Sequence, residues 1–250
     1  MKRTFLAVAI VLVLSVVFTG CTRKNQSAAD YFPVSKNLYW EYEGIGNEFA
    51  GGRVDTEFIE GNRVQLAQNN GGTVVAKVFE VSDEGVKLVN SIEESYYRIN
   101  YLAKEPAQER YYLKSPLKEK ASWQDGDTTW TIESLEEKVK VPAGEFTCIK
   151  VVGKSGDSVV ERYFAKGVGL VKQKFVFNDN VVEENLSKFG DAEKDNCLPE
   201  KELAIYYPSK NVDKLLEDRV VEKFKTGETL AERITELLKD EKYRVLSKNT

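Results

Sequence analysis

The chain has 250 residues, with 36 lysines and arginines against 40 aspartates and glutamates, a formal net charge of −4 and no histidine. Without histidine, a Ser-His-Asp triad and the His-containing catalytic zinc sites are excluded, so we expect a protein that is not an enzyme and carries no metal or cofactor. The charges are interspersed without a basic block, so nucleic acid is not expected as a partner.

The first 21 residues have the order of a secretory signal that ends in a lipoprotein cleavage site. Met1-Lys2-Arg3 is positive, residues 4–17 are uncharged and mostly apolar, and Phe18-Thr19-Gly20-Cys21 closes the segment. We therefore predict a signal peptide over residues 1–20 and a diacylglycerol on the thiol of Cys21. A transmembrane anchor is the alternative, because the uncharged run over residues 4–20 is just long enough to cross a bilayer.

Two cysteines remain once Cys21 is assigned to lipid. Outside the reducing cytosol, Cys148 and Cys197 could form a disulfide. Cys148 lies in the apolar run Phe146-Thr147-Cys148-Ile149, so a buried free thiol is the alternative.

After a polar, lipidated tether over residues 21–29, residues 30–190 predict strand after strand. Short runs rich in Val, Ile, Tyr and Phe are separated by turn formers at short intervals. Such tight turns indicate antiparallel pairing, because parallel strands need long crossovers. The fold class that follows is mainly β: an antiparallel meander forming an open barrel or a strongly curved sheet. The expected strands lie at 38–42, 56–59, 63–66, 74–81, 86–92, 96–102, 109–113, 129–132, 151–152, 159–164, 169–177 and 181–186.

One proline–tryptophan spacing occurs twice within this region. Pro33 precedes Trp40 by the same interval that separates Pro116 from Trp123, and both stretches are expected as extended segments that lead into a strand with a core tryptophan. Duplication of a half-barrel and coincidence are the two explanations.

The pattern changes after residue 190. Residues 191–202 are polar and predict a linker, and residues 203–207 predict a strand that ends before Pro208. Residues 214–225 fit either a helix or a strand. Thr226 is expected to cap a helix whose apolar stripe includes Leu230, Ile234 and Leu237. This α+β module over residues 203–250 is too small to bury a core unaided, so we expect it to pack on the β domain or to be part of a longer domain.

Tyrosines supply the candidate ligand site. In a strand, adjacent residues face opposite sides, so each tyrosine pair would present one ring outward and build a flat aromatic platform for a glycan or peptide. Alternatively the rings stack across strands or cover a second layer. The candidates are Tyr96, Tyr97, Tyr101, Tyr111 and Tyr112.

Several motifs resemble an uncharacterised family of clostridial-type cell-surface lipoproteins. They are Tyr31-Phe32-Pro33, residues 42–50, residues 69–73, residues 141–146 and residues 163–172. Members of that family commonly continue into a sporulation and germination domain of the GerMN type, and residues 203–208 and 228–239 are similar to its opening. The resemblance implies a hairpin strand at 215–224, an assembly role in the envelope of a spore-former, and a module that is incomplete at Thr250. It brings no catalytic residues.

Together these observations predict a membrane-anchored, extracytoplasmic lipoprotein with a binding or scaffolding role in the cell envelope, linked to sporulation or germination. Its expected partners are the membrane, through the lipid anchor, and an envelope protein or peptidoglycan. Two alternatives stay open: a carrier that holds a lipid or other apolar ligand on the curved sheet, and a carboxylate-based glycan hydrolase.

Overall fold

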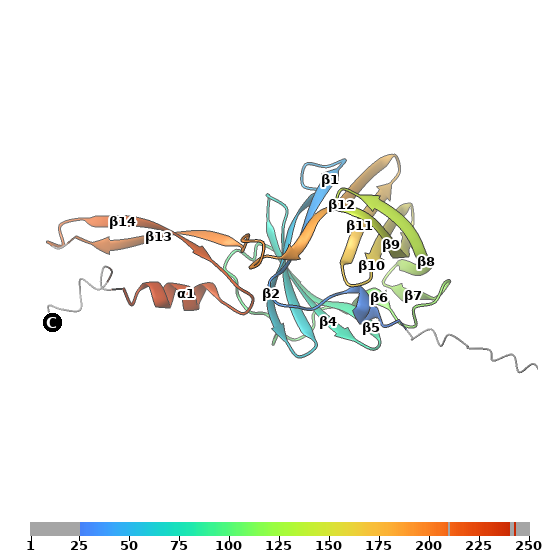
Figure 1. Cartoon of the computed structure of the whole chain (residues 1–250), viewed down its shortest axis with the longest axis horizontal. Coiled ribbons are helices and arrows are strands. Elements are labelled where there is room, and N and C mark those ends of the chain that lie inside the picture. The colour runs from blue at the N-terminus through green and yellow to red at the C-terminus, as the bar shows by residue number, and fades with distance from the viewer. Residues whose placement is uncertain (1–25, 210, 241–242, 244–250) are drawn as a thin grey trace, which may run out of the picture.

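Twelve strands of one antiparallel sheet make up the body of the molecule (Figure 1). The structure is a computed structural model that describes residues 26–209, 211–240 and 243. The first run of six strands comprises β1 (Leu38–Ile45), β2 (Gly51–Glu60), β3 (Arg63–Asn69), β4 (Val74–Ser82), β5 (Gly85–Ile92) and β6 (Arg110–Lys114). The second comprises β7 (Ser122–Asp125), β8 (Thr128–Val141), β9 (Gly144–Ser155), β10 (Ser158–Ala165), β11 (Gly169–Phe177) and β12 (Asn180–Asp191).

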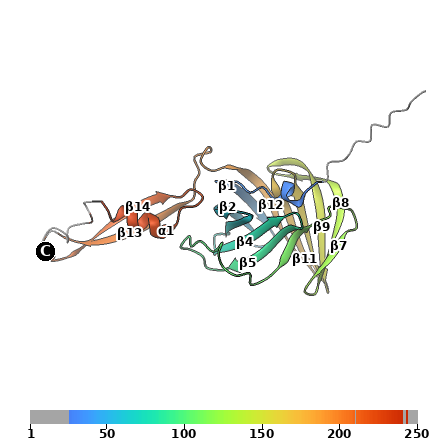
Figure 2. The ribbon, with the colours of Figure 1, turned by 90° about the horizontal axis from the view of Figure 1, so that it is seen from below.

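The two runs join where the first strand pairs with the last. β1 and β12 are antiparallel, from Leu38 opposite Asp191 to Ile45 opposite Glu183. The resulting order is β6-β5-β4-β3-β2-β1-β12-β11-β10-β9-β8-β7, and the sheet curls until its end strands β6 and β7 lie close together (Figure 1; Figure 2 shows the sheet from below). The predicted fold class, an antiparallel meander curved into an open barrel, is confirmed.

Trp40 and Trp123 lie in β1 and β7, the strands that open each run of six. This is the arrangement that duplication of a half-barrel would give.

Alternating side chains of the strands fill the interior of the barrel. The fully buried members include Ile132, Ile149, Phe164 and Leu186, from β8, β9, β10 and β12. Packing between β8 and β9 is so tight that position 153 requires a glycine. A Cβ at Gly153 would lie 2.7 Å from the indole ring of Trp130 on the neighbouring strand.

A second, smaller apolar layer covers the outer face of β2, β4 and β5. Phe58, Val78 and Val89 pack there against Leu102, which belongs to the segment between β5 and β6. The prediction of a strand at 96–102 is wrong, because this segment is a series of turns. Side chains of the sheet hold it in place: the buried amide of Gln65 accepts from Tyr101 N at 2.8 Å and donates to Ile99 O at 2.9 Å.

The first described element, the 3-10 helix η1 (Ala28–Tyr31), packs into the barrel. Ala28 and Tyr31 are buried in the main core, and the ring of Phe32 lies 4.8 Å from that of Phe79. A salt bridge of 3.1 Å between Lys166 and Asp30 ties the helix to the loop after β10. The segment that leads into β1 therefore forms part of the interior wall.

A hairpin and a helix project from the barrel as an arm (Figure 1). The hairpin consists of β13 (Glu200–Pro208) and β14 (Leu215–Lys223), and it is followed by α1 (Leu230–Leu237). The ambiguous stretch at 214–225 is thus a strand. The helix begins later than expected, because its N-cap is Thr229 and not Thr226: the Thr229 hydroxyl accepts from Glu232 N, and the Glu232 carboxylate accepts from Thr229 N.

Thr226 instead fastens the arm to the barrel. Its hydroxyl accepts from Asn37 N at 2.7 Å and donates to Thr56 O at 2.8 Å. Nearby, Phe224 is only 1 % exposed and lies under the guanidinium of Arg98, 4.9 Å from ring centroid to Cζ. Arg98 in turn donates to the carbonyls of Lys225 and Glu228.

Candidate functional site

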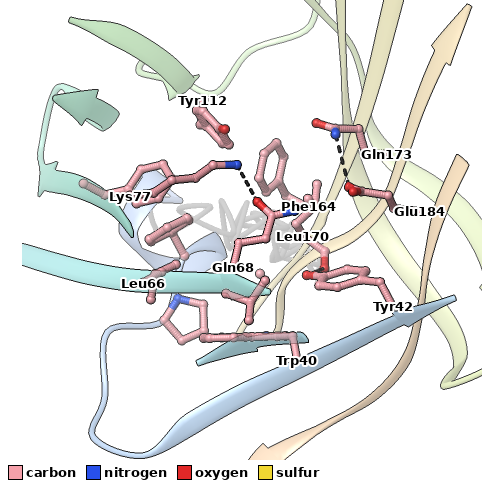
Figure 3. A pocket seen from close by; sticks show the side chains of 15 residues that line it. Trp40, Tyr42, Leu66, Gln68, Lys77, Tyr112, Phe164, Leu170, Gln173 and Glu184 are labelled. Carbon is pink, nitrogen blue, oxygen red and sulfur yellow. Dashed lines mark hydrogen bonds between the residues drawn. The ribbon is translucent and has the colours of Figure 1, made fainter. Parts of the chain in front are cut away.

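The barrel holds a cavity of about 90 Å³ that is lined by β1, β2, β3, β4, β6, β10, β11 and β12 and by the segment before β1 (Figure 3). One side of its wall is apolar and the other is polar. The apolar wall comes from Phe32, Pro33, Trp40, Val54, Leu66, Phe79, Phe164 and Leu170. The polar wall comes from Tyr42, Gln68, Lys77, Tyr112, Gln173 and Glu184.

Strand register places part of the polar wall on three neighbouring strands. Arg162 of β10 lies opposite Gln173 of β11, which lies opposite Glu184 of β12. Arg162 Nε donates to Gln173 Oε1 at 3.0 Å, and Gln173 Nε2 donates to Glu184 Oε2 at 3.2 Å. Burial raises the pKa of Glu184, against the opposing pull of Lys77 and Arg162. The row therefore carries one cation and one anion, bridged by an amide.

Arg162 also lies over aromatic rings. Its Cζ is 4.0 Å from the ring centroid of Tyr112 and 4.4 Å from that of Trp130, at cation–π distance. Burial lowers the pKa of this guanidinium, although the surrounding acidic groups oppose the shift. The stacking fixes the guanidinium behind the cavity wall.

Lys77 supplies a second positive charge, from β4 on the opposite side of the cavity. Its ammonium donates a hydrogen bond to Gln68 Oε1 on β3 (Figure 3). Burial alone would raise the pKa of Tyr112, but the charges of Lys77 and Arg162 outweigh it and lower that pKa. Among the described residues Lys77 forms no salt bridge within 4 Å, so its ammonium is not bonded to a carboxylate, and it acts on Glu184 only by opposing the rise in the pKa of that carboxyl.

The remaining polar atoms of the wall are already paired. Trp40 Nε1 donates to Val168 O at 2.7 Å, and the Tyr42 hydroxyl donates to Leu170 O at 2.9 Å. Both aromatic side chains therefore present their rings, not their polar atoms, to the cavity.

The five candidate tyrosines do not share one surface. Tyr112 lines the cavity, whereas Tyr111, its neighbour on β6, hydrogen-bonds Glu84 on the outside. Tyr96, Tyr97 and Tyr101 lie in the turns before β6, and Tyr97 is 66 % exposed. The predicted alternation thus holds for the pair on β6, and only Tyr112 of the five belongs to this cavity.

Cys148 and Cys197 are both free thiols, so the predicted disulfide is not formed. Cys148 is buried in β9, where burial, helped by Glu137, raises its pKa to about 12. Cys197 lies beside Arg53, whose guanidinium donates to the Cys197 carbonyl at 2.6 Å.

Cys21 and the signal peptide over residues 1–20 lie outside the described residues, so lipidation stays a prediction. None of the helices in the described part of the chain has the length and apolar character needed to cross a membrane. Within the same residues, no group of three or more acidic or cysteine side chains is placed to hold a metal ion.

Of the residues that make the cavity polar, Tyr112 was a candidate from the sequence, whereas the charged residues were not predicted to line a cavity. Lys77, Arg162 and Glu184 each occur in predicted strands, but charged residues in such strands are normally expected on the solvent face. A cue was present on β4: Lys77 shares a face with Phe79 and the opposite Leu66, both of them core residues.

These features define a nearly closed antiparallel β-barrel with a small amphipathic cavity. No protein-family model matches the chain, and no curated protein is detectably similar to it.

Two solved structures are similar to the chain. One is a candidate exported protein with a YmcC-like fold from Bacteroides fragilis, at 12 % identity and a TM-score of 0.40, covering 64 % of this chain and 98 % of that one. Another is a candidate lipoprotein from Parabacteroides distasonis, at 13 % identity and a TM-score of 0.31, covering 66 % of this chain and all of the other. The relation to clostridial-type lipoproteins and to the GerMN domain stays a prediction.

Proposed function

We propose that this protein is a lipid-anchored, extracytoplasmic binding protein of the cell envelope, and that its barrel takes a small organic anion with a short apolar part. The sequence order that ends at Cys21 supports the anchor. The availability of Lys77 inside a cavity with one apolar wall supports the ligand class, and this single observation carries the proposal.

The charges of the cavity favour an anion. Glu184 is engaged by Gln173 and lies near two cations, whereas the hydrogen-bond partners of Lys77 are the neutral amide of Gln68 and the hydroxyl of Tyr112. A carboxylate that approaches Lys77 would gain a charge-assisted hydrogen bond in a partly desolvated site. An incoming cation would compete with Lys77 and Arg162 for the single carboxylate.

The size of the cavity limits the apolar part of the ligand. At about 90 Å³ it is smaller than the roughly 150 Å³ cavity that takes up benzene in an engineered protein core. A short alkyl group fits between Trp40, Leu66 and Phe79, and the whole acyl chain of a membrane lipid does not. The cavity therefore favours small-molecule binding over the carrying of a lipid.

Binding also fits the cavity better than glycan hydrolysis. That chemistry needs two carboxyl groups facing each other across the scissile bond. Glu184 is the one acidic residue among those that line the cavity.

Titration of the protein with butanoate, followed by calorimetry and tryptophan fluorescence, tests the ligand class. We expect butanoate to bind and 1-butanol, which has no charge, to bind more weakly. Replacing Lys77 by Gln should weaken butanoate binding by about ten- to a hundredfold, the value of a hydrogen bond between charged groups.

Lys118→Gln is the matched control, because Lys118 is an exposed lysine in the loop between β6 and β7. It should bind butanoate as the wild type does. Equal affinity for the acid and the alcohol, or equal loss in both variants, would contradict the proposal.

A further inference from the structure

A second cavity lies at the junction between the barrel and the arm. It has a volume of about 100 Å³ and takes its lining from both parts. The barrel contributes Asn69, Ser95, Tyr96 and Arg98, and the arm contributes Pro199, Lys201 and Phe224. None of the cavity's residues belongs to the wall of the interior cavity.

Ser95 gives the first sign that this cavity accepts a ligand. The residue is only 5 % exposed, and its hydroxyl has no hydrogen-bond partner among the described residues. Leaving a buried hydroxyl unpaired costs free energy, so such groups normally have a partner. Ser95 lines a cavity large enough to hold a small ligand, and such a ligand would supply the missing hydrogen-bond partner.

Lys201 gives the second sign. It lies on β13 on the opposite side of the same cavity, and it forms no hydrogen bond or salt bridge within 4 Å with its side chain among the described residues. Burial, with a smaller contribution from the positive charge of Arg98, lowers the pKa of Lys201 against the pull of Glu57.

Three carboxylates line the cavity, and all are already engaged. Glu200 pairs with Lys223 at 3.2 Å. Arg53 holds Asp55 with its Nε and Nη2 at 2.8 to 3.0 Å. Glu57 accepts from Gln65 Nε2 at 2.8 Å and pairs with Arg98 at 3.4 Å. The groups left over are thus an ammonium, which only donates, and a hydroxyl, which can donate or accept. The positive charge of the ammonium favours an anion over a cation.

We propose that this junction cavity binds the carboxylate of a small molecule or of a peptide C-terminus, held between Lys201 of the arm and Ser95 of the barrel. The apolar lining of Val74, Pro199 and Phe224 leaves room for one small alkyl group next to the carboxylate. A ligand so placed contacts both parts of the molecule, and its binding would stabilise the arm against the barrel.

The test is a titration of the full chain, labelled with ¹⁵N, with acetate, with N-acetyl-Ala-Ala and with the C-terminal amide of that peptide. Binding at the junction should shift the amide signals of Ser95 and Tyr96. A response to acetate identifies a free carboxylate, and a response to the peptide acid alone identifies a peptide terminus. An equal response to the peptide amide would overturn the proposal.

Two variants and two controls locate the site. Lys201→Gln and Ser95→Ala should each weaken the binding by about tenfold or more. Lys214→Gln, an exposed lysine next to β14, should leave it unchanged. Lys77→Gln should also leave it unchanged, so failure of the interior cavity to bind butanoate and failure of this site are separate results. Unchanged shifts in Lys201→Gln would place the anion elsewhere and refute the proposal.

Discussion

Glu57 and Arg98 are 2 % and 5 % exposed, and burial disfavours the charged form of both side chains. Burial raises the pKa of Glu57 and lowers that of Arg98, so the attraction between them does not fully offset their desolvation. The pair connects β2, which carries Glu57, to the segment between β5 and β6, which carries Arg98. Arg98 also donates hydrogen bonds to the arm.

Removing one partner of this pair should be far more harmful than removing both. Arg98→Met leaves the Glu57 carboxylate buried without its cation, and we expect a loss of about 3–5 kcal/mol in the free energy of unfolding at pH 7. The double variant with Glu57→Gln should recover a large part of that loss. Urea unfolding of the two variants and the wild type measures the difference.

The loss should depend on pH in a defined direction. The folded-state pKa of Glu57 lies above its ordinary value, so between those two values the folded protein binds more protons than the unfolded chain, and stability falls as the pH rises. Without Arg98 the pKa should rise further, so Arg98→Met should lose less stability at pH 5 than at pH 7. A loss of equal size at both pH values would show that Glu57 is not the cause. Arg219→Met, which removes an exposed arginine from the arm, should change little at either pH.

At the scale of elements, the arm is attached through very few side chains. Phe224 follows β14 directly, its ring is packed beneath Arg98, and its N–H donates to Pro199 O at 3.0 Å. The outer face of the hairpin carries exposed apolar residues, including Val221, which is 59 % exposed.

Phe224→Ala should therefore loosen the arm and leave the barrel folded. Truncating a buried phenylalanine costs about 3–5 kcal/mol, and here the cost falls on the attachment of the arm. We expect faster proteolysis between β12 and β13 and faster hydrogen exchange at Thr226 and Gly227, with the exchange of β8 and β9 unchanged. Val221→Ala on the exposed face is the control. Equal slow exchange in both variants would show that Phe224 does not carry the attachment.

Most strands were predictable, because each pairs with its neighbour in sequence across a short turn. The stretch at 96–102 has the composition of a strand, but its backbone bonds to side chains such as Gln65 and not to a ladder, and composition does not reveal that difference. Thr226 and Thr229 are equally good caps by residue type; only the reciprocal bond with Glu232 identifies Thr229.

The interior cavity was harder to predict than the strands, because the sequence pattern does not show which face of each strand turns inward. Period-two alternation tells which residues share a face, but the face that turns inward is usually recognised by its apolar character. Here Lys77, Arg162 and Glu184 lie on the inward face. The junction cavity is lined by Lys201 and Ser95, which are far apart in sequence. No local sequence pattern predicts that the fold brings them to the same cavity.

For the molecule as a whole, the proposed anchor predicts where the protein is found in the cell. Cys21→Ala should move the protein from the membrane fraction to the medium or the extracytoplasmic fluid, and it should abolish labelling by a palmitate analogue. Cys197→Ala, which removes a half-buried thiol, should leave both unchanged. Labelling that persists in Cys21→Ala would contradict the anchor.

The proposed anchor at Cys21 lies shortly before η1 in the sequence, so the position of η1 on the barrel indicates which side would face the membrane. The helix packs on the side of the barrel away from β13 and β14, and the hairpin points outward from the opposite side (Figures 1 and 2). Nine residues of β13 extend for about 30 Å at the usual rise of a strand. With the proposed anchor near its amino terminus, the chain would have its hairpin on the side of the barrel away from η1, and a partner approaching that side would touch the hairpin before it reached the barrel.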